Sequence, residues 1–169
     1  MVDILVTGCS GGGKSTLLEE LELRGHAVVR EPGRRLIAAG ITPWADMSGF
    51  LAAAVDMARA DLGWHAASTG PVFYDRGLID ALAGLERLGG DAVGTVLGNE
   101  RPYSGGVFLA PPWPDLFAQD EARRHSLAEA ISEYEHLASL LPVLGYRPIE
   151  LPRAPVAERA DFILDALDA

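Results

Sequence analysis

Apolar residues recur along the chain in two patterns, one typical of strands and one typical of helices. The first apolar run, Ile4 to Val6 within residues 2–7, is typical of a buried strand. Similar short runs predict strands at 26–30, 72–74, 107–109 and 146–151. Between them, helical spacing predicts helices after residue 14, from 48, from 78, over 127–141 and from 156. The alternation predicts an α/β fold with a five-stranded, mainly parallel sheet and helices on both faces.

Several local signals set the expected boundaries. Gly25 is well placed to follow the end of the first helix, and Ser48 to cap the start of the helix that begins there. Proline and glycine at 32–33 stop the second strand, so residues 31–35 should lie at the carboxyl edge of the sheet. We see no repeat and no long linker, and we therefore expect a single domain over residues 1–169.

Composition narrows the classes of function. The formal net charge of −10 argues against general binding to nucleic acids. A single cysteine, Cys9, excludes an internal disulfide, and the four histidines lack the spacing of metal ligands. We expect neither a signal peptide nor a transmembrane segment, and so a cytoplasmic protein without a membrane partner. The oligomeric state is left open.

The chemistry is indicated first by the segment from Gly8 to Ser15, which fits G-x-x-x-x-G-K-[ST], the phosphate-binding loop called Walker A. It lies between an expected strand and an expected helix, which is the context the motif requires. Four of the six residues from Gly8 to Gly13 are glycine, so the backbone can adopt positive φ and approach a ligand closely. Its N–H groups can then surround phosphate oxygens at the start of a helix.

The motif predicts a bound nucleoside triphosphate, ATP or GTP, together with Mg²⁺. Lys14 would neutralise the β- and γ-phosphates, and the hydroxyl of Ser15 would bind the metal. The residues expected to contact the nucleotide are Gly8, Ser10, Gly11, Gly12, Gly13, Lys14, Ser15 and Thr16.

Two further groups of charged residues follow expected strands. Glu31, with Arg34 and Arg35, follows the second strand, and Asp75-Arg76 follows the third. Right-handed crossovers would bring these strand ends to the same side of the sheet as the loop. Phosphoryl transfer needs a carboxylate to orient or deprotonate the nucleophile and cations for the developing charge, which these residues can supply. At least one of the arginines at 34 and 35 is expected to be a surface charge.

At these positions the chain resembles P-loop kinases of small molecules. Residues 30–33 resemble the segment after the second strand of thymidylate kinases, and Asp75-Arg76 resembles their aspartate-arginine motif. Over nearly its whole length the chain is similar to a family of small predicted AAA-type P-loop ATPases, which are themselves similar to nicotinamide riboside kinase domains. This likeness is carried by residues 8–16, 31–35, 74–80, 108–113 and 123–124. It implies a three-layer P-loop NTPase fold.

The resemblance also implies roles for single residues. Asp75 would hold Mg²⁺, directly or through water, or act as the base, and Glu31 competes with it for the role of base. Arg76 and Arg34 would contact the acceptor. Gly77 stands where thymidylate kinases often have an aromatic residue, so the acceptor need not be a nucleotide.

Three more arginines are implied to contact the nucleotide. Arg123 and Arg124 would belong to a lid over the triphosphate, around residues 115–128, although a solvated helix start explains them equally well. Arg153 follows the fifth strand, where P-loop kinases commonly flank the adenine, and is a candidate for stacking on the base.

Several of these residues also have a structural interpretation. Asp75 could merely cap the following helix, and Glu31 could be a turn carboxylate or the partner of an arginine. Asp80 is expected to be structural, and Trp113 is expected to pack in the core rather than to stack on a ligand.

The leading hypothesis is a Mg²⁺-dependent kinase that transfers the γ-phosphoryl group of ATP to a small metabolite, with a nucleoside or a nucleotide among the candidate acceptors. The alternatives are an NTPase or nucleotide-dependent switch, and a nucleotide-binding module without turnover. No expected strand ends in the Asp-Glu pair that motor ATPases use to activate water, which favours the kinase.

Overall fold

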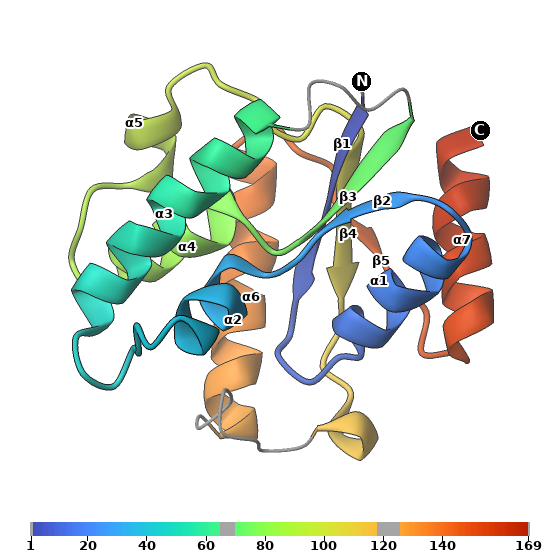
Figure 1. Ribbon diagram of the computed structural model, residues 1–169, viewed down its shortest axis with the longest axis horizontal. Coiled ribbons are helices and arrows are strands. Elements are labelled where there is room, and N and C mark those ends of the chain that lie inside the picture. The colour runs from blue at the N-terminus through green and yellow to red at the C-terminus, as the bar shows by residue number, and fades with distance from the viewer. Residues whose placement is uncertain (1, 65–69, 118–125, 169) are drawn as a thin grey trace.

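The computed structural model describes residues 2–64, 70–117 and 126–168, and its centre is a five-stranded sheet (Figure 1). The strands are β1 (Val2–Gly8), β2 (Ala27–Val29), β3 (Pro71–Asp75), β4 (Gly106–Ala110) and β5 (Ile149–Glu150). Their order across the sheet is β2-β3-β1-β4-β5, and all four neighbouring pairs are parallel. The expected five-stranded parallel sheet is confirmed.

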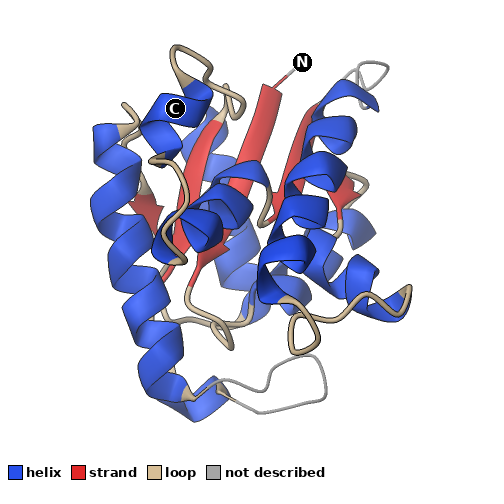
Figure 2. Cartoon of the chain, turned by 90° about the vertical axis from the view of Figure 1, so that its left-hand side faces the viewer, coloured by secondary structure: helices blue, strands red, loops and turns tan. Residues whose placement is uncertain are grey.

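Helices cover both faces of the sheet, which gives three layers (Figures 1 and 2). One face packs against α1 (Lys14–Leu23) and α7 (Val156–Asp168). The other packs against α3 (Met47–Trp64), α4 (Leu78–Arg87), α5 (Val93–Leu97) and α6 (Leu127–Val143). The short α2 (Pro32–Ala38) follows β2 directly and packs on α3.

The central strands β1, β3 and β4 are mainly apolar because both faces of the sheet are buried there. On β1, Ile4 and Val6 join the cluster under α1 and α7, whereas Leu5 joins the cluster under α3, α4 and α6. All three side chains are fully buried. Burial of each such side chain contributes roughly 1.5–3 kcal/mol, so the central strand anchors both layers.

Strand register sets which side chains meet at the carboxyl edge of the sheet. Val6 of β1 lies opposite Asp75 at the end of β3, and Gly8 lies opposite Ala110 at the end of β4. The loop after β1 therefore begins beside Asp75. In open α/β sheets, ligands bind outside this edge.

Some expected boundaries were wrong for identifiable reasons. Ser48 lies inside α3, and Asp46 occupies the capping position instead, since its Oδ1 accepts a hydrogen bond from the backbone N–H of Gly49 at 3.0 Å. The fifth strand is shorter than residues 146–151 and comprises Ile149–Glu150. Gly25 follows the end of α1 with φ +92°, as expected.

Two α-helices in the described part of the chain had not been predicted, α2 and α5. Pro32 was interpreted as the end of a strand, but it occupies the first turn of α2, where its missing N–H is not needed. The five residues of α5 are too few to show a helical period. None of the helices in the described parts of the chain has the length and apolar character that crossing a membrane requires.

Candidate active site

The phosphate-binding loop connects β1 to α1 in a conformation that depends on glycine. Gly8, Gly11 and Gly13 have φ of +113°, +77° and +73°. A Cβ on Gly8 would lie 2.4 Å from the carbonyl oxygen of Ala110 on the neighbouring strand. The next residue fastens the loop there, because the N–H of Cys9 donates to the same oxygen at 2.9 Å. These glycines are required by backbone conformation and close approach.

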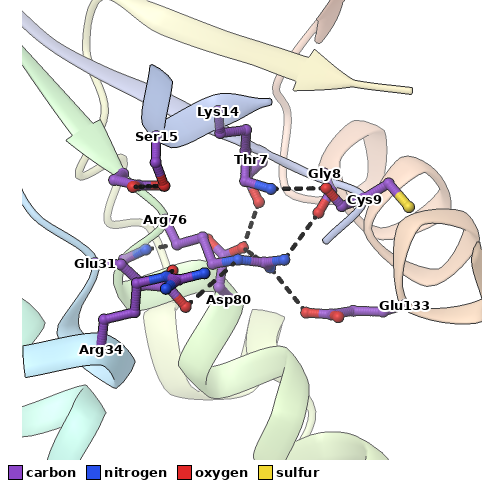
Figure 3. Close-up of polar contacts among 12 residues, drawn as sticks. Thr7, Gly8, Cys9, Lys14, Ser15, Glu31, Arg34, Arg76, Asp80 and Glu133 are labelled. Carbon is purple, nitrogen blue, oxygen red and sulfur yellow. Dashed lines mark hydrogen bonds and ion pairs between the residues drawn. The ribbon is translucent and has the colours of Figure 1, made fainter. Parts of the chain in front are cut away.

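Lys14, the first residue of α1, is held inside the loop. Its side chain is 6% exposed, and its Nζ donates to the carbonyl oxygen of Cys9 at 2.7 Å (Figure 3). Burial, with a further contribution from the nearby Arg76 charge, lowers the pKa of Lys14 to about 8. The ammonium is therefore poorly solvated, and an anionic phosphate would stabilise its charge further than the nearby Asp75 and Glu31 do.

Asp75 and Ser15 form an oxygen-rich pair beside the lysine. The hydroxyl of Ser15 donates to Asp75 Oδ2 at 3.3 Å. Burial, followed by repulsion from Glu31, raises the pKa of Asp75 to about 6. Its other oxygen, Oδ1, is buried and has no hydrogen-bond partner among the described residues. An unpaired carboxylate oxygen of this kind needs a cation or a donor from a ligand.

This pair fits a magnesium ion. Mg²⁺ prefers hard oxygen ligands and usually keeps several waters, with one or two side chains and the substrate phosphates completing its shell. The described part of the chain contains no cluster of three or more His, Cys, Asp or Glu residues that could hold a metal alone. Ser15 and Asp75 therefore suit a metal that arrives with a nucleotide.

Arg76 lies at the centre of a cluster of carboxylates (Figure 3). Its Nη1 contacts Asp80 at 3.1 Å and Glu133 at 2.8 Å, its Nη2 donates to the carbonyl oxygen of Gly8 at 3.1 Å, and its Nε lies 3.8 Å from Glu31. Burial opposes its charge, but the carboxylates, led by that of Glu133, outweigh burial and raise its pKa. Arg76 thus joins β1, β3, α4 and α6 around the loop.

Asp80, rather than Asp75, secures the start of α4. It accepts hydrogen bonds from the backbone N–H of Gly77 at 3.1 Å and from the hydroxyl of Thr7. Tyr103 supports the same turn, because its hydroxyl accepts from the N–H of Leu78 at 2.9 Å. The alternative in which Asp75 caps the helix is not seen, whereas the structural role expected for Asp80 is.

Glu31 and Arg34 lie at the entrance of α2. Arg34 Nε lies 3.3 Å from Glu31 Oε2, and Glu31 also faces Arg76. Arg35 turns to α3 instead, where it pairs with Asp61 at 2.7 Å. Arg35 is therefore the surface charge expected of one of the two arginines.

A cavity of about 410 Å³ lies between the phosphate-binding loop, α2, α3 and the start of α4. One end is lined by Lys14, Ser15 and Asp75, and the charged wall by Glu31 and Arg76. The other end is apolar and is formed by α2, α3 and the loop before α3, through Pro32, Ile37, Pro43, Met47, Phe50, Leu51 and Ala54. Its size lies within the range of small-molecule sites, and its two ends suit a charged group and an apolar one.

Sequence reasoning missed two charged residues and the apolar wall. Glu133 on α6 and Arg159 on α7 reach the site from helices far along the chain, and neither belongs to a motif. On α3, Phe50 and Leu51 line the cavity as well as packing in the small cluster between α2 and α3. Spacing predicted this helix but not which of its faces borders a ligand.

Of the three arginines outside the strand ends that were predicted to contact the nucleotide, Arg153 alone belongs to the described residues. Arg153 donates from Nε and Nη2 to the carbonyl oxygen of Pro112, at 3.0 and 2.7 Å, and is not among the residues that line the cavity. Arg123 and Arg124 lie outside the described residues, as does most of the expected lid around 115–128. The prediction of core packing for Trp113 was wrong, since its half-buried ring lies against the guanidinium of Arg159, 5.4 Å from ring centroid to Cζ.

Solved structures with the same arrangement of elements come from kinases. The chain is similar to a deoxyadenosine kinase from M. mycoides with the products dCMP and dCDP, with a TM-score of 0.67 and 14% identity over 99% of each chain. A structure of deoxyadenosine kinase from M. mycoides with bound dATP gives a TM-score of 0.64 and 15% identity, covering 99% of this chain and all of the other. At such identity the likeness shows the fold, which is that of P-loop kinases.

Comparison at the level of sequence identifies a family. None of the curated proteins matches the chain. Residues 3–159, which include the phosphate-binding loop, Asp75, Glu133 and Arg159, match a family described as an AAA domain. The chain is therefore a member of this AAA-domain family of P-loop proteins, with the fold of a small P-loop kinase.

Proposed function

We propose that this protein is a Mg²⁺-dependent phosphotransferase that moves the γ-phosphoryl group of ATP to a hydroxyl group of a small acceptor. The observation that carries the proposal is the continuity of the cavity, which connects Lys14, Ser15 and Asp75 to the apolar end formed by α2, α3 and the loop before α3, called the apolar chamber below. A hydrolase or switch needs no second chamber beside its phosphates. A kinase needs one to position the acceptor in line with the transferred group.

The nucleotide would bind through the loop, with Lys14 compensating the phosphate charge. Ser15 and Asp75 would hold Mg²⁺, which when bound supplies charge stabilisation for the transferred phosphoryl group. Because Asp75 is buried and hydrogen-bonded to Ser15, it suits the metal better than the acceptor. The preference between ATP and GTP is set by contacts with the base, and we assign no such contact to the residues that line the described cavity.

Glu31 is the better candidate for the base that orients or deprotonates the acceptor hydroxyl. Its side chain is partly exposed and lies on the cavity wall between the loop and the apolar chamber. Arg34 and Arg76 keep it in place from two sides. A positioned base of this kind typically contributes roughly 10²- to 10⁴-fold to the rate.

The charges of the chamber favour an uncharged acceptor. The two arginines on its described wall, Arg34 and Arg76, are each paired with carboxylates, and Arg76 faces three of them. A phosphate on the acceptor would approach Glu31, Asp80 and Glu133 and would have to displace an existing ion pair. An apolar ring that carries a free hydroxyl fits both the wall of α3 and the carboxylate. Since the similar solved structures are of deoxyadenosine kinases, nucleosides are the first compounds to test.

The test is a transfer assay with γ-labelled ATP and Mg²⁺ against nucleosides, their 5′-monophosphates and other small alcohols. We expect label in a new compound, formed from a nucleoside or another alcohol and not from a monophosphate. The variant Lys14→Ala should abolish transfer, and Glu31→Gln should reduce transfer more than background hydrolysis. Glu22→Gln is the matched control. It changes an exposed carboxylate of α1 that pairs with Arg30, and it should change neither transfer nor background hydrolysis.

The outcomes separate the parts of the proposal. Release of labelled phosphate without transfer to any compound would contradict the kinase and support the NTPase. Transfer to monophosphates alone would contradict the argument from charge while leaving the kinase intact. A protein that binds no nucleotide at all would overturn the proposal.

A further inference from the structure

We infer that Arg159 of α7 is a positioning residue for nucleotide binding, which acts on the phosphates through the backbone of the phosphate-binding loop. Its Nη1 donates to the carbonyl oxygens of Gly12 and Gly13, at 3.3 and 3.2 Å. The inference rests on the proposed function in one respect, namely that the loop binds a nucleotide. No sequence motif marks this residue, which lies 146 positions after Gly13.

The peptide groups that follow Gly12 and Gly13 explain how Arg159, which contacts the loop on the side of α7, can affect the side that faces the cavity. In a trans peptide the N–H points away from the C=O, and none of the described peptides is cis. By holding the carbonyl of Gly12, Arg159 turns the N–H group of Gly13 the other way. The carbonyl of Gly13 also accepts from the backbone N–H of Leu17 at 3.2 Å, so the N–H of Lys14 is oriented by Arg159 together with the first turn of α1. Gly13 and Lys14 both line the cavity, and no described residue accepts a hydrogen bond from either N–H. These are the donors that a phosphate would use.

The loop is shaped to admit the guanidinium. Glycine is required here by its φ of +73°, and a Cβ on Gly13 would lie 2.9 Å from Arg159 Nη1, so any side chain at this position would displace the guanidinium. On its other side the guanidinium lies against the ring of Trp113. The pocket between loop, ring and helix thus fixes the position of the cation.

Burial and charge indicate that Arg159 does more than join α7 to the loop. The residue is 4% exposed, its Nε is buried without a partner, and no described carboxylate forms an ion pair with it. An unneutralised buried cation is costly, and for packing alone an apolar side chain of similar volume would serve better. Beside a site for phosphates, the same charge favours the ligand, because the surrounding protein screens it weakly.

Calorimetric titration of the full-length protein with ADP and with AMP tests the inference. In Arg159→Met, ADP should bind about tenfold to hundredfold more weakly, because the charge-assisted hydrogen bonds that orient the N–H donors of the loop are lost. AMP lacks the β-phosphate and should lose much less. In Arg159→Ala, added guanidinium should restore part of the ADP affinity, whereas sodium chloride at the same ionic strength should not.

Arg24→Gln is the matched control. Arg24 also ties α1 to α7, through Glu20, Asp161 and the carbonyl oxygen of Ala157, but at the end of α1 remote from the loop. Its loss should leave the affinity for ADP within about twofold, as expected for an exposed ion pair. If Arg159→Met fails to fold in a thermal melt, Arg159→Lys decides, since one ammonium cannot replace the planar guanidinium and ADP affinity should fall several-fold.

Unchanged ADP affinity in the folded variants, or equal losses for ADP and AMP, would overturn the inference. These results are distinct from a failure of the proposed function. If the unmodified protein binds no ADP, the nucleotide site itself is wrong, whereas tight binding that is insensitive to Arg159 contradicts this inference alone.

Discussion

The affinity for nucleotide should fall as the pH rises above 8, because Lys14 must carry its charge to bind phosphate. The pKa of Lys14 in the free protein is lowered to about 8, mainly by burial. Near pH 7 most molecules hold the ammonium form, and binding needs no proton. Above pH 8 most molecules are neutral at this position, and binding must take up a proton.

The size of the effect follows from linkage. Affinity should fall roughly tenfold, or about 1.4 kcal/mol, for each pH unit above 8, until the pKa of Lys14 in the complex is reached. The stability of the free protein should change in the opposite direction. The unfolded chain keeps Lys14 protonated up to about its ordinary value of 10.5, so between pH 8 and 10.5 it binds more protons than the folded protein. Lys14 therefore contributes an increase in the free energy of unfolding across that range.

Isothermal titration calorimetry with ADP, from pH 7 to pH 9.5 in pairs of buffers with different ionisation enthalpies, measures both affinity and proton uptake. Uptake should approach one proton per nucleotide above pH 8. Urea unfolding of the wild type and of Lys14→Met, over the same range, separates this effect from alkaline unfolding. At pH 7, Lys14→Met should be more stable than the wild type by up to about 3 kcal/mol, since a buried cation is removed. A pH-independent affinity between 7 and 9.5, without proton uptake, would refute the reasoning.

Three other changes test separate parts of the site. Asp75→Asn should lower Mg²⁺-dependent turnover by roughly two orders of magnitude while metal-free ADP still binds, and should abolish the acidic limb of kcat/KM near pH 6; normal turnover would exclude Asp75 as a metal ligand. Gly77→Ala should cost about 1–3 kcal/mol of unfolding free energy, because its Cβ would lie 2.1 Å from the Tyr103 hydroxyl; with Tyr103→Phe the losses should be less than additive in a double-mutant cycle measured by urea unfolding. Arg35→Gln, which removes the exposed cation that pairs with the buried Asp61, should cost about 1–3 kcal/mol of unfolding free energy and leave turnover unaltered, and a large loss of turnover would contradict the assignment of Arg35 to the surface.

The fold was predictable because parallel strands are buried on both faces and so appear as apolar runs, of which β1 is the clearest. The ends of elements were harder to predict, because they depend on single contacts. Asp46 rather than Ser48 caps α3 through one hydrogen bond, and Pro32 can end a strand or begin a helix. In each case the competing interpretation obeys the same local rules.

The residues of the candidate site also fall into those that the local sequence predicts and those that depend on tertiary contacts. The loop was predictable because its function lies in the local backbone, and Asp75 because it directly follows a strand. Glu133 and Arg159 could not be found in this way, since only the packing of α6 and α7 brings them to Arg76 and Gly13. The partners of a site residue are a property of the tertiary structure.

Burial acts in opposite directions on the two central ionisable groups of the site. It lowers the pKa of Lys14 to about 8 and raises that of Asp75 to about 6, so it disfavours the charged form of each. Between these values both groups are still charged, yet each is short of the solvation that water would give. A nucleotide phosphate relieves the first and a metal cation the second. Because MgATP brings both charges at once, it should bind this site more tightly than ATP or Mg²⁺ alone, and the range of about pH 6 to 8 should be where it does so best.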